Sequence, residues 1–251
     1  MNRSLEIMDT TLRDGEQTSG VSYSPKEKLT IAKLLLDELK IDRIEVASAR
    51  VSEGELNSVK QITDWAKKNN KIESIEVLTF IDEGKSIKWL LDSGCLVQNL
   101  LTKGSINHLK HQLKKTPSNH FKDILKTINN AEENSIQTNI YLEDWSNGMK
   151  DSKDYVMDFL DFLYDKRIKR LLLPDTLGIL THQETYEYIS EIKMKYPDFH
   201  IDFHGHNDYD LSVGNSMEAI RAGCNGLHLT INGMGERAGN TPLSSAVAAI
   251  R

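Results

Sequence analysis

The sequence has only two cysteines in 251 residues, Cys95 and Cys224, and both stand in apolar contexts. Two cysteines are too few for the disulfide framework that holds small secreted domains together, so we expect a hydrophobic core instead. No apolar run approaches the roughly 20 residues of a membrane-spanning helix. The N-terminal segment also lacks the long apolar core of a secretory signal. These absences favour a soluble, cytoplasmic protein.

Basic residues are not in excess either: 31 Lys and Arg stand against 37 Asp and Glu, a formal net charge of −6. Nucleic acids and anionic membranes attract basic surfaces, so we expect neither as a partner. Basic residues do gather between Lys103 and Lys122, and we interpret them as a solvated helix face and loop. We expect His108, His111 and His120 at the surface, because they form no recognisable constellation.

Short β-rich runs alternate with longer amphipathic stretches along the whole chain. The strand candidates are residues 5–11, 43–48, 73–80, 96–101, 136–143, 168–174, 199–206 and 226–231. Seven helical patterns lie between them, as in residues 24–40, where Ser24 can cap the helix and Pro25 stands at its first position. This alternation predicts an α/β fold with a parallel sheet, and eight repeats predict a closed (β/α)8 TIM barrel.

No linker or shift in composition marks a second domain, so we expect residues 1–251 to form a single barrel domain. After the eighth strand only the start of a final helix, "LSSAVAAIR" (243–251), is present. We interpret this as a truncated last helix, either because the chain is cut short or because its remainder belongs to a further domain.

Alternation within the strands predicts which side chains point into the barrel, because residues i and i+2 share a face. In the seventh strand this face carries Asp202, His204 and His206. In other strands it carries polar residues as well: Glu45, Asn139, Tyr141, Glu143, His228 and Thr230. Barrel interiors are normally filled by branched aliphatic residues. Burying charged side chains without partners would cost several kcal/mol each, and a cation near their upper ends would remove that cost.

The two histidines of "HGHND" (204–208) pose a choice between a metal-binding pair and two polar residues of a loop. Strands one, seven and eight become neighbours when the barrel closes, so we expect Asp14 to meet His204 and His206 at the carboxyl ends of the strands. The glycine-rich segment 231–240 leaves strand eight over the same place. One carboxylate and two imidazoles suit Zn, Mn or Mg, and the residue types do not choose among these metals.

Parity also separates the neighbouring carboxylates Glu143 and Asp144. Glu143 follows Asn139 and Tyr141 to the interior, whereas Asp144 points away or belongs to the loop. We therefore favour Glu143 as the functional carboxylate. The alternative is that Glu143 is a hydrogen-bonded structural carboxylate.

Five segments carry a family resemblance over nearly the whole chain. They are "DTTLRDGEQ" (9–17), "IEV" (44–46), "PDTLG" (174–178), "HGHNDYDLSVGNS" (204–216) and "NGMGERAGNTPL" (232–243). In this order they resemble the metal-dependent aldolase and lyase barrels that include 2-isopropylmalate synthase, homocitrate synthase, citramalate synthase and hydroxymethylglutaryl-CoA lyase. The resemblance implies a divalent metal, an acyltransferase that condenses acetyl-CoA with a 2-keto acid, and a homodimer.

The resemblance also implies roles by position. Asp14, His204 and His206 match the family's metal ligands, and Asn240 matches a residue close to the metal. Arg13 matches the arginine that stabilises the enolate or oxyanion.

Further positions are implied to hold substrate. Glu143 matches the acidic residue at the end of strand five, and it is our candidate for the base within this chain. Glu45 and Thr230 fall at inward positions that line the pocket in relatives, and Gln17 is a third substrate-binding candidate.

The sequence also departs from the family's pattern. Lyase relatives carry a cysteine in the glycine-rich loop, whereas "GMGERAGN" (233–240) has none, which favours the synthases over a carbon–carbon lyase or a keto-acid carboxyl-transfer enzyme. The synthases of the family have C-terminal regions beyond the barrel, one of which supplies a catalytic histidine to the partner subunit, and we expect no such region in this chain. A catalytically incomplete metal-binding barrel is therefore a further alternative. "YLEDWSNG" (141–148) differs from the usual strand five, so the acceptor stays open among 3-methyl-2-oxobutanoate, 2-oxoglutarate and pyruvate.

Overall fold

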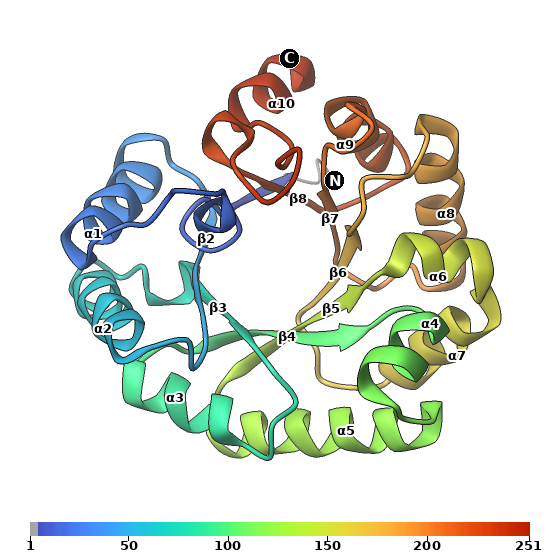
Figure 1. The fold of residues 1–251 in the computed structure, drawn as a ribbon, viewed down its shortest axis with the longest axis horizontal. Helices are drawn as coiled ribbons and strands as arrows, with labels where there is room; N and C mark the ends of the chain where they lie inside the picture. Colours follow the sequence, from blue (N-terminus) through green and yellow to red (C-terminus); the bar gives the residue numbers. More distant parts are fainter. Residues whose placement is uncertain (1–4) are drawn as a thin grey trace.

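The computed structural model describes residues 5–251, which form a closed barrel of eight parallel strands inside a ring of helices (Figure 1). The strands follow one another around the barrel in sequence order, and β1 closes it by pairing with β8. They are β1 (Glu6–Asp9), β2 (Arg43–Ser48), β3 (Ile75–Thr79), β4 (Val97–Lys103), β5 (Gln137–Glu143), β6 (Arg170–Asp175), β7 (Ile201–Gly205) and β8 (Gly226–Leu229). The predicted TIM barrel and its eight strands are confirmed.

The helices cover the outside of the barrel (Figure 1). They are α1 (Pro25–Lys33), α2 (Glu53–Lys68), α3 (Lys85–Ser93), α4 (Ile106–His108), α5 (Pro117–Glu133), α6 (Trp145–Asp151), α7 (Lys153–Tyr164), α8 (His182–Lys195), α9 (Ser212–Arg221) and α10 (Leu243–Ile250). The prediction of one helix per connection is wrong twice. The connection from β4 to β5 contains α4 and α5, and the connection from β5 to β6 contains α6 and α7. The last helix, α10, is short, with 8 residues. Within residues 5–251, no helix is long and apolar enough to cross a membrane.

The start of α1 shows how local sequence sets an element boundary. The Ser24 backbone N–H donates to the Glu27 carboxylate at 2.8 Å, while the Ser24 hydroxyl accepts from the Glu27 backbone N–H. This capping box gives hydrogen-bond partners to the backbone N–H groups of both Ser24 and Glu27. Pro25 fits the first helical position because a backbone N–H has no helical partner there, so its absence costs nothing. The helix then continues into a π-helical turn over Leu34–Glu38. The helix expected from the sequence here is confirmed.

The apolar core lies between the strands and the helix ring. Outward-facing strand residues such as Ile44, Val46, Ile201 and Phe203 are fully buried there. Each buried side chain of this size stabilises the fold by about 1.5–3 kcal/mol. The alternation read from the sequence thus places the aliphatic side chains outside the sheet, against the helices.

The lower part of the barrel interior is filled by an ion-paired cluster. Arg43 of β2 reaches across the lumen to Asp202 of β7 at 2.5 Å and also contacts Glu76 of β3 at 3.0 Å. His228 of β8 lies 3.1 Å from the same Asp202 carboxylate. The predicted polar lumen is confirmed, but its carboxylates find cationic partners within the chain, so the lower lumen needs no added cation.

Above this cluster, a chain of hydrogen bonds leads toward the carboxyl ends of the strands. Asn139 donates to Asn99 at 2.8 Å, and Asn99 donates to Glu45 at 2.8 Å. The other carboxylate oxygen of Glu45 accepts from Thr10 at 2.8 Å and from Arg13 at 2.6 Å. The packed lumen therefore holds the loop after β1 from below.

Replacing Arg43 with alanine tests the lower cluster. The Asp202 and Glu76 carboxylates would stay buried without their cation, so we expect the free energy of unfolding to fall by about 3–5 kcal/mol. Chemical denaturation measures this loss. Arg167→Ala is the control, because Arg167 is 83% exposed and its pair with Glu132 contributes little. Equal losses in the two variants would contradict the assignment.

Asp9, at the end of β1, supplies a test by pH. Its Oδ1 accepts from the Thr11 backbone N–H at 2.8 Å, and its Oδ2 has no hydrogen-bond partner in the described part of the chain. Burial raises the pKa of Asp9 from 3.8 to about 7. A raised folded pKa means that ionisation disfavours the fold, increasingly from about pH 4 to pH 7. We expect Asp9→Asn to match the wild type in stability near pH 4 and to exceed it at pH 8. A difference in unfolding free energy that does not change with pH would refute this.

Candidate metal centre

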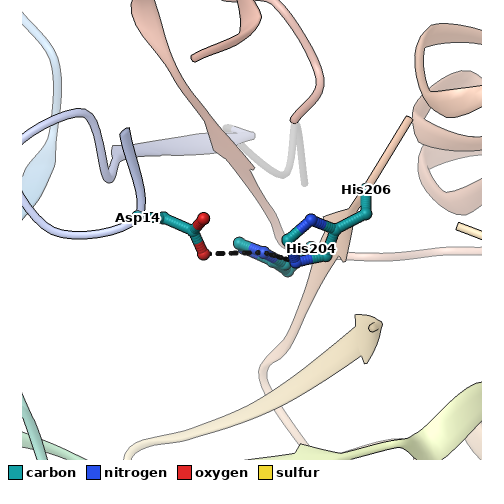
Figure 2. A group of neighbouring side chains, drawn as sticks. All are labelled: Asp14, His204 and His206. Atoms are coloured by element: carbon teal, nitrogen blue, oxygen red, sulfur yellow. Dashed lines mark hydrogen bonds and ion pairs between the residues drawn. The ribbon is translucent and has the colours of Figure 1, made fainter. Parts of the chain in front are cut away.

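Three side chains from opposite ends of the sequence meet at the carboxyl ends of β1 and β7. Asp14 stands in the turn after β1, His204 in β7 and His206 directly after it, and all three are buried. The two Nε2 atoms of the histidines are 3.2 Å apart, and Asp14 Oδ2 lies 3.5 Å from His204 Nε2. Figure 2 shows the carboxylate and both rings turned toward one another. One potential ligand atom from each residue lies within 4.8 Å of the others, which makes the group a possible metal site.

The protonation states suit a cation. Burial lowers the pKa of His204 well below its ordinary value and lowers that of His206 as well, so both rings are neutral. Burial alone would raise the pKa of Asp14, but the Arg13 guanidinium and the hydrogen bond from Asn240 bring it below its ordinary value. Neutral imidazole and ionised carboxylate are the forms that bind metals. Two neutral imidazole nitrogens facing each other in a buried site fit a divalent cation as their shared partner.

Asp14 is oriented by two donors. Arg13 donates to Oδ2 at 2.8 Å, and Asn240 donates to Oδ1 at 3.0 Å and to the Met234 carbonyl at 2.9 Å. Asn240 Oδ1 is buried without a hydrogen-bond partner among residues 5–251. A Cβ at Gly235 would lie only 2.2 Å from Asn240 Nδ2, so the loop can approach Asn240 only with glycine there.

The loop that carries Asp14 is fixed from behind by a buried lysine. Lys28 of α1 is fully buried, and its ammonium lies 2.6 Å from Glu16 and 2.5 Å from Glu55. It also donates to the Leu12 carbonyl at 3.3 Å. Because Leu12 and Glu16 flank Asp14 in sequence, these contacts limit the movement of that carboxylate.

A pocket of about 250 Å³ opens beside the three side chains. Its polar lining includes Arg13, Gln17 and Glu143, all expected as site residues from the sequence. Part of its wall is apolar or aromatic and comes from Leu78, Phe80, Leu101 and Tyr141. The sequence analysis missed Leu78, Phe80 and Leu101. Their positions near the strand ends, on the inward-facing side of the alternation, could have identified them.

Two expected substrate-binding residues lie outside this lining. Glu45 is buried below the pocket, where it accepts from Arg13. Thr230 is buried under the glycine-rich loop, and its hydroxyl donates to the Met234 carbonyl at 2.8 Å. Their roles in substrate binding stay predictions.

The adjacent carboxylates Glu143 and Asp144 have different surroundings. Glu143 lines the pocket and pairs with the Lys103 ammonium. Asp144 is buried and accepts from Ser105 at 2.5 Å and from Asn147 at 2.8 Å, which makes it a structural carboxylate of the loop.

Two expectations about basic residues are wrong. Lys103 does not lie on a solvated face, since its side chain is only 12% exposed and contacts Glu143. His120 is fully buried rather than at the surface, and its Nε2 accepts from the Lys103 backbone N–H at 3.2 Å. The strand predicted at 96–101 ends two residues too early, so the inward parity of residue 103 escaped notice.

With this geometry in place, the family can be assigned. A sequence model described as HMGL-like matches residues 4–251. The chain belongs to the HMGL-like family. The resemblance drawn from the five sequence segments is thereby confirmed.

The HMGL-like chain has named relatives. It is 36% identical over 258 residues to a putative (R)-citramalate synthase of Methanothermobacter thermautotrophicus, covering 98% of this chain and 48% of that protein. It is 33% identical over 253 residues to a 2-isopropylmalate synthase of Pyrococcus furiosus, covering 100% of this chain and 50% of that protein. The chain thus spans about half the length of these curated relatives.

Solved structures match the HMGL-like barrel at low sequence identity. The HMG-CoA lyase of Bacillus subtilis aligns with a TM-score of 0.78 at 17% identity, covering 99% of this chain and 86% of that one. Hydroxymethylglutaryl-CoA lyase of Pseudomonas aeruginosa gives 0.79 at 16% identity, covering 99% and 85%. At such identities the likeness establishes the fold alone.

Alanine at a ligand position should remove the metal without unfolding the barrel. We expect Asp14→Ala and His204→Ala to bind Zn²⁺ or Mn²⁺ at least about tenfold more weakly than the wild type, since each removes one donor of three. Elemental analysis after dialysis, with circular dichroism as the fold check, measures this. His111→Ala, at an exposed position, is the matched control. Unchanged metal content in both ligand variants would show that the site is misplaced.

Proposed function

We propose that this HMGL-like barrel belongs to an acyltransferase that condenses acetyl-CoA with a small 2-keto acid, dependent on a divalent metal. The observation that carries the proposal is one pocket that joins the Asp14, His204 and His206 donor set to the guanidinium of Arg13 and the carboxylate of Glu143. Relatives named (R)-citramalate synthase and 2-isopropylmalate synthase support it.

Asp14, His204 and His206 would hold the cation, with Asn240 keeping the carboxylate oriented. When bound, a divalent cation supplies Lewis-acid polarisation of the keto carbonyl. The donor set suits Zn, Mn or Mg. No thiolate is among these donors, so the site is not one for soft metals.

The side chains around the pocket can carry the proton and charge movements. Glu143 would accept a proton from the acetyl methyl group, and that carbon would form a bond to the keto carbon. The keto oxygen becomes a hydroxyl by gaining a proton. Arg13, held by Asp14 and Glu45, would donate to the oxygen on which negative charge develops. Water then hydrolyses the thioester and releases the CoA thiol.

The residues of the pocket wall indicate which 2-keto acid accepts the acetyl group. Leu78, Phe80 and Leu101 offer apolar contact to the side chain of a keto acid. Lys103 is already paired with Glu143, so it offers no free charge to a second carboxylate. These contacts favour pyruvate or 3-methyl-2-oxobutanoate over 2-oxoglutarate.

The cysteines support a synthase rather than a lyase. The loop 233–240 contains none, and both cysteines of the chain are buried away from the pocket. Burial raises the pKa of Cys95 to about 12, so its thiol is unreactive at neutral pH. Neither cysteine can replace the loop cysteine expected of the lyase relatives.

Thiol release from acetyl-CoA tests the proposal. We expect release that requires both a divalent metal and pyruvate or 3-methyl-2-oxobutanoate, followed with a thiol reagent. Arg13→Ala should lower the rate by about 10²–10³ while leaving the metal content unchanged, because it removes a donor to the developing charge.

Other outcomes separate the alternatives. Cleavage of a 3-hydroxyacyl-CoA without condensation would indicate the lyase. Keto-acid binding without thiol release would indicate the catalytically incomplete barrel.

A further inference from the structure

The carboxyl ends of β4 and β5 carry a charge pair of which the proposed reaction uses only Glu143. Lys103 and Glu143 are the last residues of these strands and are partners in the parallel register. The Lys103 ammonium pairs with Glu143 Oε2, and the two side chains are 12% and 23% exposed. Glu143 lines the pocket, whereas Lys103 is not among the lining residues.

The backbone of Lys103 is held on both sides by buried rings. Its N–H donates to His120 Nε2 at 3.2 Å, and its carbonyl accepts from the Tyr155 hydroxyl at 2.7 Å. His120 is fully buried and Tyr155 nearly so. A solvated surface pair has no such support, because two flexible side chains are free to move. These contacts fix the backbone of Lys103, and the ion pair with Glu143 then holds its ammonium at that carboxylate.

An imidazole lies near the other side of the carboxylate. His108 Nδ1 lies 3.8 Å from Glu143 Oε1, while its Nε2 lies 3.5 Å from the structural carboxylate Asp144. Glu143 thus has one oxygen against an ammonium and the other beside an imidazole. The Lys103 ammonium is therefore the group that orients the carboxylate toward the pocket, whereas His108 Nδ1 lies near it and makes no hydrogen bond within residues 5–251.

The pocket needs charge compensation. Asp14, Glu143 and Glu236 bring three carboxylates to its wall. Asp14 pairs with Arg13 and would also hold the metal, and Glu236 pairs with Arg237, which leaves Glu143 with Lys103 as its cation. A 2-keto acid is itself an anion. An uncompensated carboxylate about 7 Å away would weaken its binding by roughly three- to tenfold at effective dielectric constants between about 40 and 80. Lys103 supplies the missing positive charge without taking up space in the pocket.

We propose that Lys103 is a positioning residue that neutralises Glu143 and holds its carboxylate at the pocket wall, so that an anionic 2-keto acid can bind beside it. The inference rests on the proposed function, because it takes the 2-keto acid as the ligand. It assigns the effect of Lys103 to Glu143 and not to direct contact with substrate.

Calorimetric binding of pyruvate and 3-methyl-2-oxobutanoate to the metal-loaded protein tests this without requiring turnover. We expect Lys103→Met to weaken binding by about three- to tenfold at low salt. The loss should be smaller at high salt, because dissolved ions screen the repulsion between Glu143 and the keto acid where it acts through solvent. Lys103→Arg keeps the charge and should restore binding. In the Glu143→Gln background, Lys103→Met should weaken binding less than it does in the wild type, because no carboxylate remains to be held and only the field of the ammonium on the keto acid is lost.

Controls separate the possible failures. Lys115→Met is the matched control, because Lys115 pairs with Asp123 at 2.6 Å outside this pocket, and it should bind as the wild type does. Circular dichroism checks the fold, and Lys103→Gln replaces Lys103→Met if the latter does not fold.

Three results would overturn the inference. The first is wild-type affinity in the folded neutral variant of Lys103. The second is an undiminished loss in the Glu143→Gln background. The third is a wild-type protein that binds neither keto acid, which overturns the proposed function as well; the first two leave the proposed function standing.

Discussion

The pairing of β1 with β8 is the constraint on which the site depends. Since β8 also pairs with β7, a single strand separates the turn that carries Asp14 from the two histidines. Closing the barrel therefore drives a carboxylate and two imidazoles into one buried space (Figure 2). Burying these groups is unfavourable unless each finds a partner, and a shared cation supplies one.

The barrel interior serves this arrangement throughout its depth. Arg43 and Asp202 neutralise the lower lumen, and Glu45 links the middle of the barrel to Arg13 at its top. Arg13 in turn holds Asp14 at 2.8 Å. An aliphatic lumen would stabilise the fold as well, but it would leave Arg13 without an anchor. The charged interior thus supports the site. The stability of the fold in turn requires that each buried charge keeps its partner.

Much of this was predictable from sequence because period-two alternation in eight short runs fixes both the strands and the inward faces. The same parity brought His204 and His206 together and distinguished Glu143 from Asp144. It failed where a strand was ended too early, as at Lys103, whose inward direction depends on two more residues of β4. The apolar wall at Leu78 and Leu101 was missed because aliphatic residues in strands are indistinguishable by type from ordinary core.

The central claim is that one divalent cation binds between β1 and β7. Anomalous diffraction from crystals of the protein loaded with Mn²⁺ measures this directly. We predict one strong peak bonded to the Asp14 carboxylate and to Nε2 of His204 and of His206. A metal-loaded crystal whose anomalous peak lies elsewhere, or whose peak touches only one of the three side chains, would contradict the account.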